Sequence, residues 1–232
     1  MATLDLIKTF QFEAAHRTPF EEDASRLHGH SYRLDLVVEG ELNNAYGWVM
    51  DYADITEAFE SVYQKIDHRT LNDLEGLDSP TLPDLRKWIL NEAQKHIPML
   101  TDVHLRIEGY CTFATETICE DSDAHLPDRI GFGFEAAHAL TSLPPEHKCH
   151  TMHGHSFRVE VAAESLEHLS GDLLDLYETL DHRCLNELEG LRNPTSENLS
   201  IWIWNMLAGR RDDLHAVLVA ETCTARCIYY GR

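Results

Sequence analysis

The chain is short of positive charge. Its 232 residues include 19 lysines and arginines against 40 aspartates and glutamates, a formal net charge of −21. Acidic residues outnumber basic ones in both halves, so no basic face is available for nucleic acid or an anionic membrane. An anionic small molecule could be bound only by a local cluster of arginines. We therefore expect neither nucleic acid nor a membrane as a partner.

Long apolar runs and paired cysteine motifs are also missing. No hydrophobic stretch reaches the roughly 20 residues needed to span a bilayer. The first residues do not resemble a signal peptide, since Lys8 is the only basic residue before the first histidine motif. The six cysteines form no CxxC pair and no framework of the secreted type. We therefore expect a protein of the reducing cytoplasm.

What the sequence does contain is a long internal repeat. FEAAH occurs at 12–16 and again at 134–138, and each copy is followed by HGH and an alternating segment, at 28–36 and 153–161. Shorter matches keep the same order in both halves, including DHR, LEGL and PT. A period of this length is too long for a solenoid. It predicts two fused copies of one domain of roughly 110 to 120 residues.

Composition indicates the boundary between the copies. The segment around 116–128 is rich in acidic and small residues, as expected of a linker. We assign residues 1–115 to the first domain, 116–128 to the linker and 129–232 to the second domain. Each domain is large enough for a modest core, and small enough to gain from burying further surface in an assembly.

Hydrophobic periodicity predicts the elements of the first copy. Apolar residues alternate over 4–16 and 30–38, which is typical of half-buried strands. The segment 52–66 places its apolar residues at helical intervals and predicts a helix. A second helix is expected to begin near Thr81, whose hydroxyl can cap it. A strand is expected over 103–109.

The second copy repeats this order. Strands are expected over 130–138, 155–162 and 215–221, with a helix beginning at Thr195. Both copies therefore follow two strands, two helices and two strands, with the helices on one face of an antiparallel sheet. This is an α+β fold. The open edges of such a sheet are a liability that is usually removed by pairing or closure.

Three histidines in each copy form a candidate metal site. In HxH on a strand, both side chains point to one face, and the histidine that ends the neighbouring strand can add a third ligand. Surface or hydrogen-bonded histidines are the alternative, but the duplication of the pattern favours a metal. Three imidazoles with an open fourth position suit catalytic zinc. We predict one Zn²⁺ per domain, up to two per chain, bound by His16, His28 and His30 and by His138, His153 and His155.

The order of the motifs resembles the 6-pyruvoyl-tetrahydropterin synthase superfamily. The resemblance is carried by FEAAH, by Cys-x-x-x-His-Gly-His-Ser-Phe, by Asp-His-x-x-Leu-Asn, by Pro-Thr-x-Glu-Asn-Leu and by a late Glu-Thr. It covers nearly the whole chain, twice. The short spacing from Cys149 to His153, and Asn186 after Asp-His, look more like bacterial 6-carboxytetrahydropterin synthases than animal pyruvoyl synthases.

This resemblance implies a substrate, 7,8-dihydroneopterin triphosphate, and roles for single residues. Cys149 would transfer protons, assisted by the bound cation and by a relay from Asp181 and His182. Glu221 would hold the amino-pyrimidine edge of the pterin, and Thr195 is a weaker candidate for the same pocket. The product would be 6-carboxy-5,6,7,8-tetrahydropterin, with acetaldehyde and triphosphate released, a step toward 7-deazaguanine nucleosides such as queuosine.

Each of these roles has a structural alternative. Cys149 could be an ordinary loop cysteine. Asp181 or His182 could cap a helix or form a structural hydrogen bond. Thr195 fits an N-cap better than a pterin contact, because it precedes a helical pattern.

The two copies are not equivalent. The first has Ala24 four positions before His28, where the second has Cys149 before its own HGH, and residues 17–27 contain no cysteine. Ser25 lies in the same loop, but a serine is a far poorer base than a cysteine at neutral pH. The late strand of the first copy still offers Glu108 as a pterin-binding carboxylate.

A different loss is expected in the second copy. Asp175 and Asp181 lie ten positions closer together than Asp51 and Asp67. Ten missing residues would remove about 15 Å of helix. We therefore expect the second copy to have lost or shortened its first helix.

The losses are complementary. In the family, zinc and cysteine come from one subunit and the Asp-His pair from a neighbour. The Cys149 site is therefore expected to be completed either by Asp67 and His68 of the first copy or by Asp181 and His182 of another second copy. The first copy by itself is expected to be a non-catalytic zinc site.

The resemblance also implies an assembly. The family's tunnelling-fold domains are ββααββ units whose sheets close into barrels on oligomerisation, so a trimer of this chain would supply six domains. Two functional alternatives stay open. One is pyruvoyl-type elimination of triphosphate by the same residues, and the other is a non-catalytic protein that binds zinc and a pterin.

Overall fold

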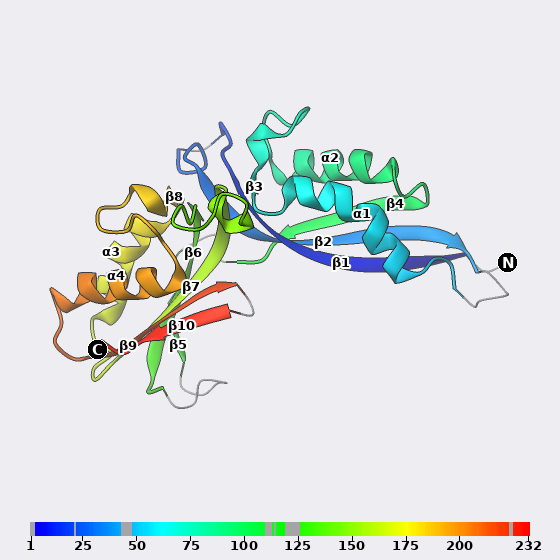
Figure 1. Cartoon of the computed structure of the whole chain (residues 1–232). Coiled ribbons are helices and arrows are strands. Elements are labelled where there is room, and N and C mark those ends of the chain that lie inside the picture. The colour runs from blue at the N-terminus through cyan, green and yellow to red at the C-terminus, as the bar shows by residue number, and fades with distance from the viewer. Residues whose placement is uncertain are drawn as a thin grey trace.

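Two lobes make up the molecule, one from each half of the chain (Figure 1). In each lobe two helices cover one face of a largely antiparallel sheet, which is the expected α+β arrangement of two domains. The structure is a computed structural model, and it describes residues 3–20, 22–42, 48–109, 113, 115–118, 126–222 and 225–232.

The first sheet is built on a long hairpin. β1 (Thr3–His16) pairs antiparallel with β2 (His28–Glu41) over its full length, so that His16 stands opposite His28. β4 (Leu100–Ile107) pairs with the other edge of β2. The two-residue strand β3 (Arg69–Thr70) runs parallel to the end of β1, which gives the order β3-β1-β2-β4.

The second sheet repeats this plan and extends it. β6 (Arg129–His138) and β7 (His153–Ala163) form the hairpin, and β9 (Leu214–Thr222) and β10 (Ala225–Tyr229) follow on one side. β5 (Glu116–Ile118) pairs antiparallel with the free edge of β6. The remaining short elements are β8 (Arg183–Cys184), which pairs with β6, and three 3-10 turns, η1 (Leu71–Asp73), η2 (Lys148–His150) and η3 (Leu185–Glu187).

Four helices cover the sheets: α1 (Tyr52–Ile66), α2 (Leu82–Gln94), α3 (Leu169–Leu180) and α4 (Ser196–Ala208). The helix predicted over 52–66 is confirmed. α2 and α4 begin after threonines that cap them as predicted, since the hydroxyls of Thr81 and Thr195 accept hydrogen bonds from the main chain three residues later. Thr195 is thus an N-cap.

Alternating side chains form the core of each lobe. Tyr32, Leu34 and Leu36 of β2 are buried on the face that carries the helices. A helical stripe packs against them from α1, namely Ile55, Phe59, Val62 and Ile66. Each such side chain stabilises the fold by roughly 1.5–3 kcal/mol through burial. The same pattern builds a separate core in the second lobe.

The first helix of the second copy is shortened as expected, but it is not lost, and the expected deletion of ten helical residues is wrong. α3 is present and has 12 residues, against 15 in α1. The expectation took Asp175 as the counterpart of Asp51, which precedes α1. Asp175 instead lies within α3, which begins six residues earlier. Its buried stripe of Leu169, Leu173, Leu176 and Leu180 has helical spacing. The helix is therefore shortened by less than one turn.

Part of the expected linker is structured. Glu116–Ile118 forms β5, so the chain joins the second sheet before the expected start of the second domain. The second lobe follows the order two strands, two helices, two strands. In the first lobe, within the described residues, only β4 follows the helices in the first sheet.

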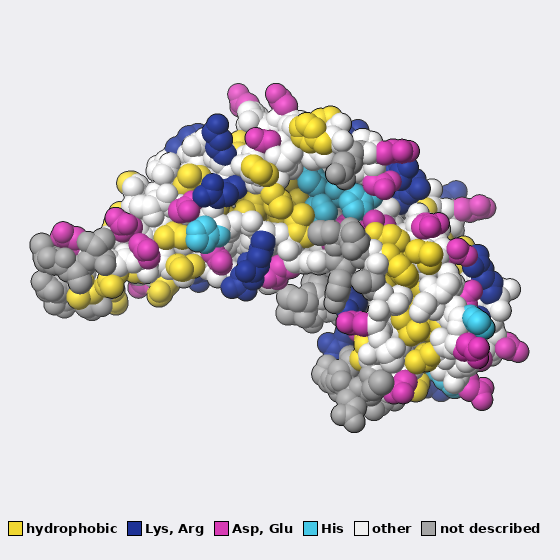
Figure 2. Space-filling view, turned by 180° about the vertical axis from the view of Figure 1, so that it is seen from behind, with side chains coloured by type: hydrophobic (Ala, Val, Ile, Leu, Met, Phe, Trp, Pro, Cys, Tyr) yellow, Lys and Arg dark blue, Asp and Glu magenta, His cyan; other side chains and the backbone are white. Residues whose placement is uncertain are grey.

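The lobes meet through the faces of the hairpins that point away from the helices. The backbones approach closely at the glycines of the two HGH motifs: a Cβ built on Gly29 would lie 2.3 Å from the Cα of Gly154. Figure 2 shows histidine side chains gathered where the lobes join. Among the described helices, none is both long and apolar enough to cross a membrane.

Candidate active site

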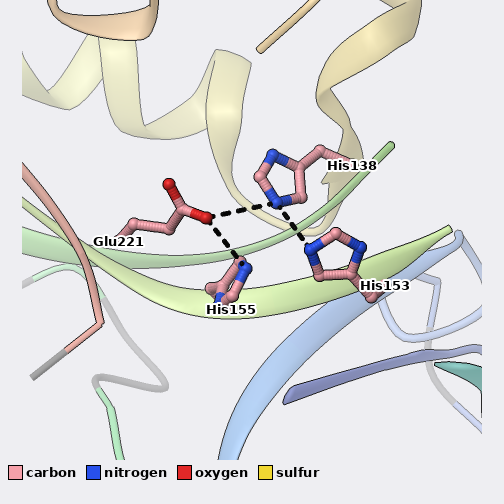
Figure 3. Close-up of side chains that lie close together, drawn as sticks. All are labelled: His138, His153, His155 and Glu221. Carbon is pink, nitrogen blue, oxygen red and sulfur yellow. Dashed lines mark hydrogen bonds and ion pairs between the residues drawn. The ribbon is translucent and has the colours of Figure 1, made fainter. Parts of the chain in front are cut away.

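One histidine cluster lies at the end of the hairpin in the second lobe. His138 ends β6 opposite His153, and His155 lies two residues along β7 on the same face. The three rings and the carboxylate of Glu221, from β9, point toward one another (Figure 3). His138 Nε2 lies 3.1 Å from His153 Nε2, and Glu221 Oε1 lies 3.2 Å from His155 Nε2. The three predicted ligands therefore converge, together with one carboxylate.

The outer nitrogen of each ring is held by a hydrogen bond. Carbonyl oxygens accept from two of the rings and a carboxylate lies against the third. The partners are Pro194 O for His138 Nδ1 (2.8 Å), Thr151 O for His153 Nδ1 (2.7 Å) and Glu13 Oε2 for His155 Nδ1 (2.9 Å). A proton on Nδ1 leaves the lone pair of Nε2 pointing inward, which is the form that binds a metal.

The residues present fit a zinc ion. Two Nε2 lone pairs facing each other at 3.1 Å repel unless a cation lies between them. The buried His155 Nε2 faces the carboxylate of Glu221, and both are groups that can bind a cation. Three imidazoles and one exchangeable position are the donor set of catalytic zinc.

Burial and charge tune these histidines in different directions. Burial lowers the pKa of His138 to about 4 and lowers the pKa of His153 further. Burial also opposes protonation of His155, but hydrogen bonds and charges from Glu13 and Glu221 outweigh it and raise its pKa to about 9. Burial by itself would raise the pKa of Glu221. The hydrogen bond and charge of His155 outweigh burial, so the pKa of Glu221 lies below its usual value.

Cys149 lies beside this cluster with a histidine from the first lobe. The ligating atoms of Cys149, His68 and His153 all lie within 4.8 Å of one another. Asp67 Oδ1 accepts from His68 Nδ1 at 2.8 Å, and Lys148 Nζ lies 3.8 Å from Asp67 Oδ2. Burial raises the pKa of the Cys149 thiol, and Lys148 opposes this only in part. Without a metal the polypeptide therefore favours the thiol form.

The Asp-His pairs are exchanged between the lobes. The His68 ring centroid lies 4.4 Å from that of His153 in the second lobe. The His182 ring lies 4.3 Å from that of His28 in the first. Of the two Asp-His pairs in this chain, the pair with His68 therefore lies next to Cys149, and the pair with His182 does not.

Both exchanged histidines have an unusual backbone. His68 has φ 55° and His182 has φ 52°, in the left-handed region that non-glycine residues rarely adopt. Each amide donates across to the FEAAH strand of its own lobe, His68 N to Glu13 O and His182 N to Glu135 O, both at 2.6 Å. Such strain persists where the surroundings fix it, and it clusters at functional sites.

The first lobe holds a second cluster of the same shape. His16, His28 and His30 converge, and His16 Nε2 lies 3.0 Å from His30 Nε2. Burial lowers their pKa values to about 3, 2 and 3. The outer nitrogens face Pro80 O for His16 (2.8 Å), Arg26 O for His28 (2.9 Å) and Glu135 Oε2 for His30 (2.8 Å). This cluster also fits a metal.

The predicted carboxylate of the first site lies elsewhere. Ile107 pairs with Tyr32, and Glu108 follows on the opposite face of the sheet, where Gln11 Nε2 donates to it at 3.0 Å. In the second sheet Ala220 pairs with Arg158, so Glu221 stands on the histidine face. Relative to the paired strand, Glu108 therefore lies one residue further along than Glu221, which turns its side chain to the opposite face. Glu108 does not reach the first cluster.

Two glutamates that the motifs contained had no predicted role. Glu13 and Glu135, the second residues of the two FEAAH motifs, each contact a histidine of the other lobe. Burial raises the pKa of Glu135 to about 9. The sequence did contain a sign of such a role, because the glutamate of FEAAH is repeated together with the histidine. Only the histidine could be assigned a function from the sequence.

Metal-free protein is expected to lose stability between pH 7 and pH 5. The folded pKa of His28 is about 2 against 6.5 in the unfolded chain, so below pH 6.5 the unfolded state binds more protons. One such histidine costs about 2 kcal/mol at pH 5. The pKa of His155 is raised on folding, to about 9, so protonation of His155 stabilises the folded state. This stabilisation is already fully present below pH 6.5 and does not change the loss expected at pH 5.

The measurement is denaturant unfolding with a chelator at both pH values. The wild type is compared with His28→Gln, which lacks one such group. The variant should lose about 2 kcal/mol less on acidification. An equal loss in both proteins would contradict the assigned shift.

The sequence is similar to proteins of one known family in both halves. The sequence matches the family described as 6-pyruvoyl tetrahydropterin synthase twice, over residues 5–115 and 129–232. A dihydroneopterin monophosphate aldolase from Pyrococcus furiosus is 37% identical over 93 residues, which are 40% of this chain and 77% of the relative. A 6-carboxy-5,6,7,8-tetrahydropterin synthase from Synechocystis is 40% identical over 120 residues, with 43% and 89% covered.

A solved structure aligns with half of the molecule. The 6-pyruvoyl tetrahydropterin synthase of Caenorhabditis elegans covers 47% of this chain and 98% of its own, with a TM-score of 0.40 and 20% identity. The family match spans both halves, each with its own histidine cluster. The chain therefore belongs to the 6-pyruvoyl tetrahydropterin synthase family, with two regions of that family in tandem.

Proposed function

We propose that the second site converts 7,8-dihydroneopterin triphosphate to 6-carboxy-5,6,7,8-tetrahydropterin, releasing acetaldehyde and triphosphate in a step toward queuosine-type nucleosides. The observation that carries this proposal is the gathering of Cys149, His68 and Glu221 around one histidine triad. The similarity of the chain to the Synechocystis 6-carboxy-5,6,7,8-tetrahydropterin synthase supports it.

Each side chain of the second site has a separate role in the proposed reaction. A zinc ion bound by the triad would act as a Lewis acid toward the hydroxyls of the substrate side chain. Cys149 moves a proton at the side-chain carbon, and His68 exchanges that proton with Cys149. Asp67 orients His68 through Nδ1, at 2.8 Å. Glu221 accepts from the N–H groups of the pterin ring.

The first site binds zinc but does not catalyse the reaction. Its histidines fit a metal, and Asp181 with His182 stands beside them. It has no cysteine in the loop before His28, and Ile107 takes the strand position that Glu221 has in the second site. A site without the proton-transferring thiol and the pterin-binding carboxylate lacks the chemistry of the second.

A second candidate activity is cleavage by an aldolase. The Pyrococcus relative is a dihydroneopterin monophosphate aldolase, and it is 37% identical over 93 residues of this chain. Such a reaction breaks a carbon–carbon bond of the side chain and releases an aldehyde that still carries phosphate. Pyruvoyl-type elimination would release triphosphate and no aldehyde. A protein that only binds zinc and a pterin would release neither.

Product analysis separates these activities. Purified protein is incubated with 7,8-dihydroneopterin triphosphate and, separately, with the monophosphate. Acetaldehyde and a carboxylated pterin are expected from the triphosphate, and Cys149→Ala should abolish both. A phosphorylated aldehyde, or triphosphate without aldehyde, would contradict the proposal in favour of the corresponding alternative. No product above the Cys149→Ala control would leave the binding function.

We also propose that the chain assembles as a trimer whose sheets close into barrels. β5 covers the edge of β6, so the strands that would pair with another chain in the second sheet are the outer strands β5 and β10. The location is proposed to be the reducing cytoplasm.

A further inference from the structure

Each histidine triad depends on the other lobe for one hydrogen bond. In the second triad, the Nδ1 atoms of His138 and His153 donate to carbonyls of their own lobe. Only His155 turns its Nδ1 to the first lobe, to Glu13 Oε2 at 2.9 Å. The first triad repeats this arrangement, because His30 is the one ring whose Nδ1 faces the other lobe.

The two glutamates are fixed by a reciprocal network. Ser31 Oγ donates to Glu13 at 2.6 Å, and Ser156 Oγ donates to Glu135 at 2.7 Å. Each serine hydroxyl also accepts from the other serine's amide, at 3.0 Å for Ser31 N and 3.1 Å for Ser156 N. Glycines 29 and 154 let the two backbones approach closely enough for these bonds.

We propose that Glu13 and Glu135 are reciprocal positioning residues, each of which sets the metal affinity of the other lobe's histidine triad. Glu13 holds His155 with its proton on Nδ1 and its Nε2 turned to the metal, and Glu135 does the same for His30. Outer partners of this kind typically change metal affinity by about 10–100-fold. Docking of the lobes thereby completes both metal sites.

The position of the glutamates supports a role across the lobes and not within them. Alternation along β1 and β6 places Glu13 and Glu135 on the opposite face from His16 and His138. Glu135 is fully buried and Glu13 is largely buried, with 0% and 14% of their side chains exposed. Burying a carboxyl group is costly unless it has hydrogen-bond partners, and Oε2 of each glutamate lies against a histidine of the neighbouring lobe and accepts from a serine of its own lobe.

The test measures zinc affinity in the full chain by chelator competition, without substrate. Two backgrounds isolate the sites: His28→Ala leaves only the second triad, and His153→Ala leaves only the first. Glu13→Ala should weaken zinc binding about 10–100-fold when only the second triad remains, and by less than about threefold when only the first remains. Glu135→Ala should give the reverse pattern.

The crossed pattern distinguishes positioning from general damage. A buried carboxylate that merely stabilises the fold would, when removed, weaken both sites alike or the site of its own lobe. Either result, or no change in either background, overturns the inference. Glu13→Gln and Glu135→Gln keep the size and one acceptor oxygen, and they repeat the comparison if the alanine variants do not fold.

Failure of this inference is separable from failure of the proposed reaction. Zinc binding is measured with no pterin present, so its outcome does not depend on which product the protein makes. Wild-type protein should bind close to two zinc ions per chain. Protein that binds none would overturn the metal sites and this inference together.

Discussion

Replacing His68 with alanine is expected to lower turnover by about 10²–10⁴-fold, the usual contribution of a positioned proton-transfer group. His68 lies next to Cys149 and His153, and Asp67 orients it. In the proposed reaction it exchanges a proton with the thiol of Cys149. The matched variant His182→Ala should keep nearly full activity, because His182 lies beside His28 in the other site.

Product formation by both variants is measured at saturating substrate, together with zinc content and thermal stability. Both variants should keep zinc and fold normally, since the outer nitrogens of both triads are held by other partners. Full activity in His68→Ala would eliminate the arrangement within one chain. Loss of activity only in His182→Ala would show that the Asp-His pair of another chain completes the Cys149 site.

Alanine at Gly29 is expected to separate the lobes and to abolish activity. The added Cβ would lie 2.3 Å from Gly154 Cα and 2.9 Å from Ala14 O, and both are backbone atoms that cannot turn away. Overpacking of this kind costs about 1–3 kcal/mol or more. If the strands move apart, His155 loses Glu13 and Cys149 loses His68. We therefore expect lower stability, weaker zinc binding and no turnover.

Gly171 provides the control. It lies in α3, and nothing stands within 4 Å of a Cβ built on it. Alanine there should stabilise the protein slightly, by about 0.5–1 kcal/mol, because glycine is unfavourable inside a helix. Thermal unfolding of both variants checks the comparison. A Gly29→Ala protein as stable and active as the Gly171→Ala protein would contradict the close packing of the lobes.

The histidine clusters were predictable because their geometry is local. His28 and His30 share a face of one strand, and His16 stands opposite His28 in the hairpin that joins them. Strand alternation and one antiparallel pairing therefore suffice to bring the three together. The helix at 52–66 was predictable for the same reason, since its buried stripe follows from a single period.

Other residues depend on register or on the docking of the lobes. Glu108 and Glu221 occupy similar places in the sequence, but one residue of register turns Glu108 to the opposite face. α3 was misjudged because an aspartate was aligned in place of the leucine stripe that begins at Leu169. The α3 error could have been detected from the helical spacing of those leucines, whereas the Glu108 error could not be detected without the strand pairing.

The sequence alone determined that two similar α+β domains each bring three histidines together, and that only the second has a cysteine beside them. These features follow from spacings within a single hairpin. The tertiary structure decided which Asp-His pair faces Cys149 and which glutamate holds each triad from outside. Those contacts join residues more than 50 positions apart across two packed lobes, where no local period constrains the pairing. Close approach of the backbones at the paired glycines is what brings them within reach.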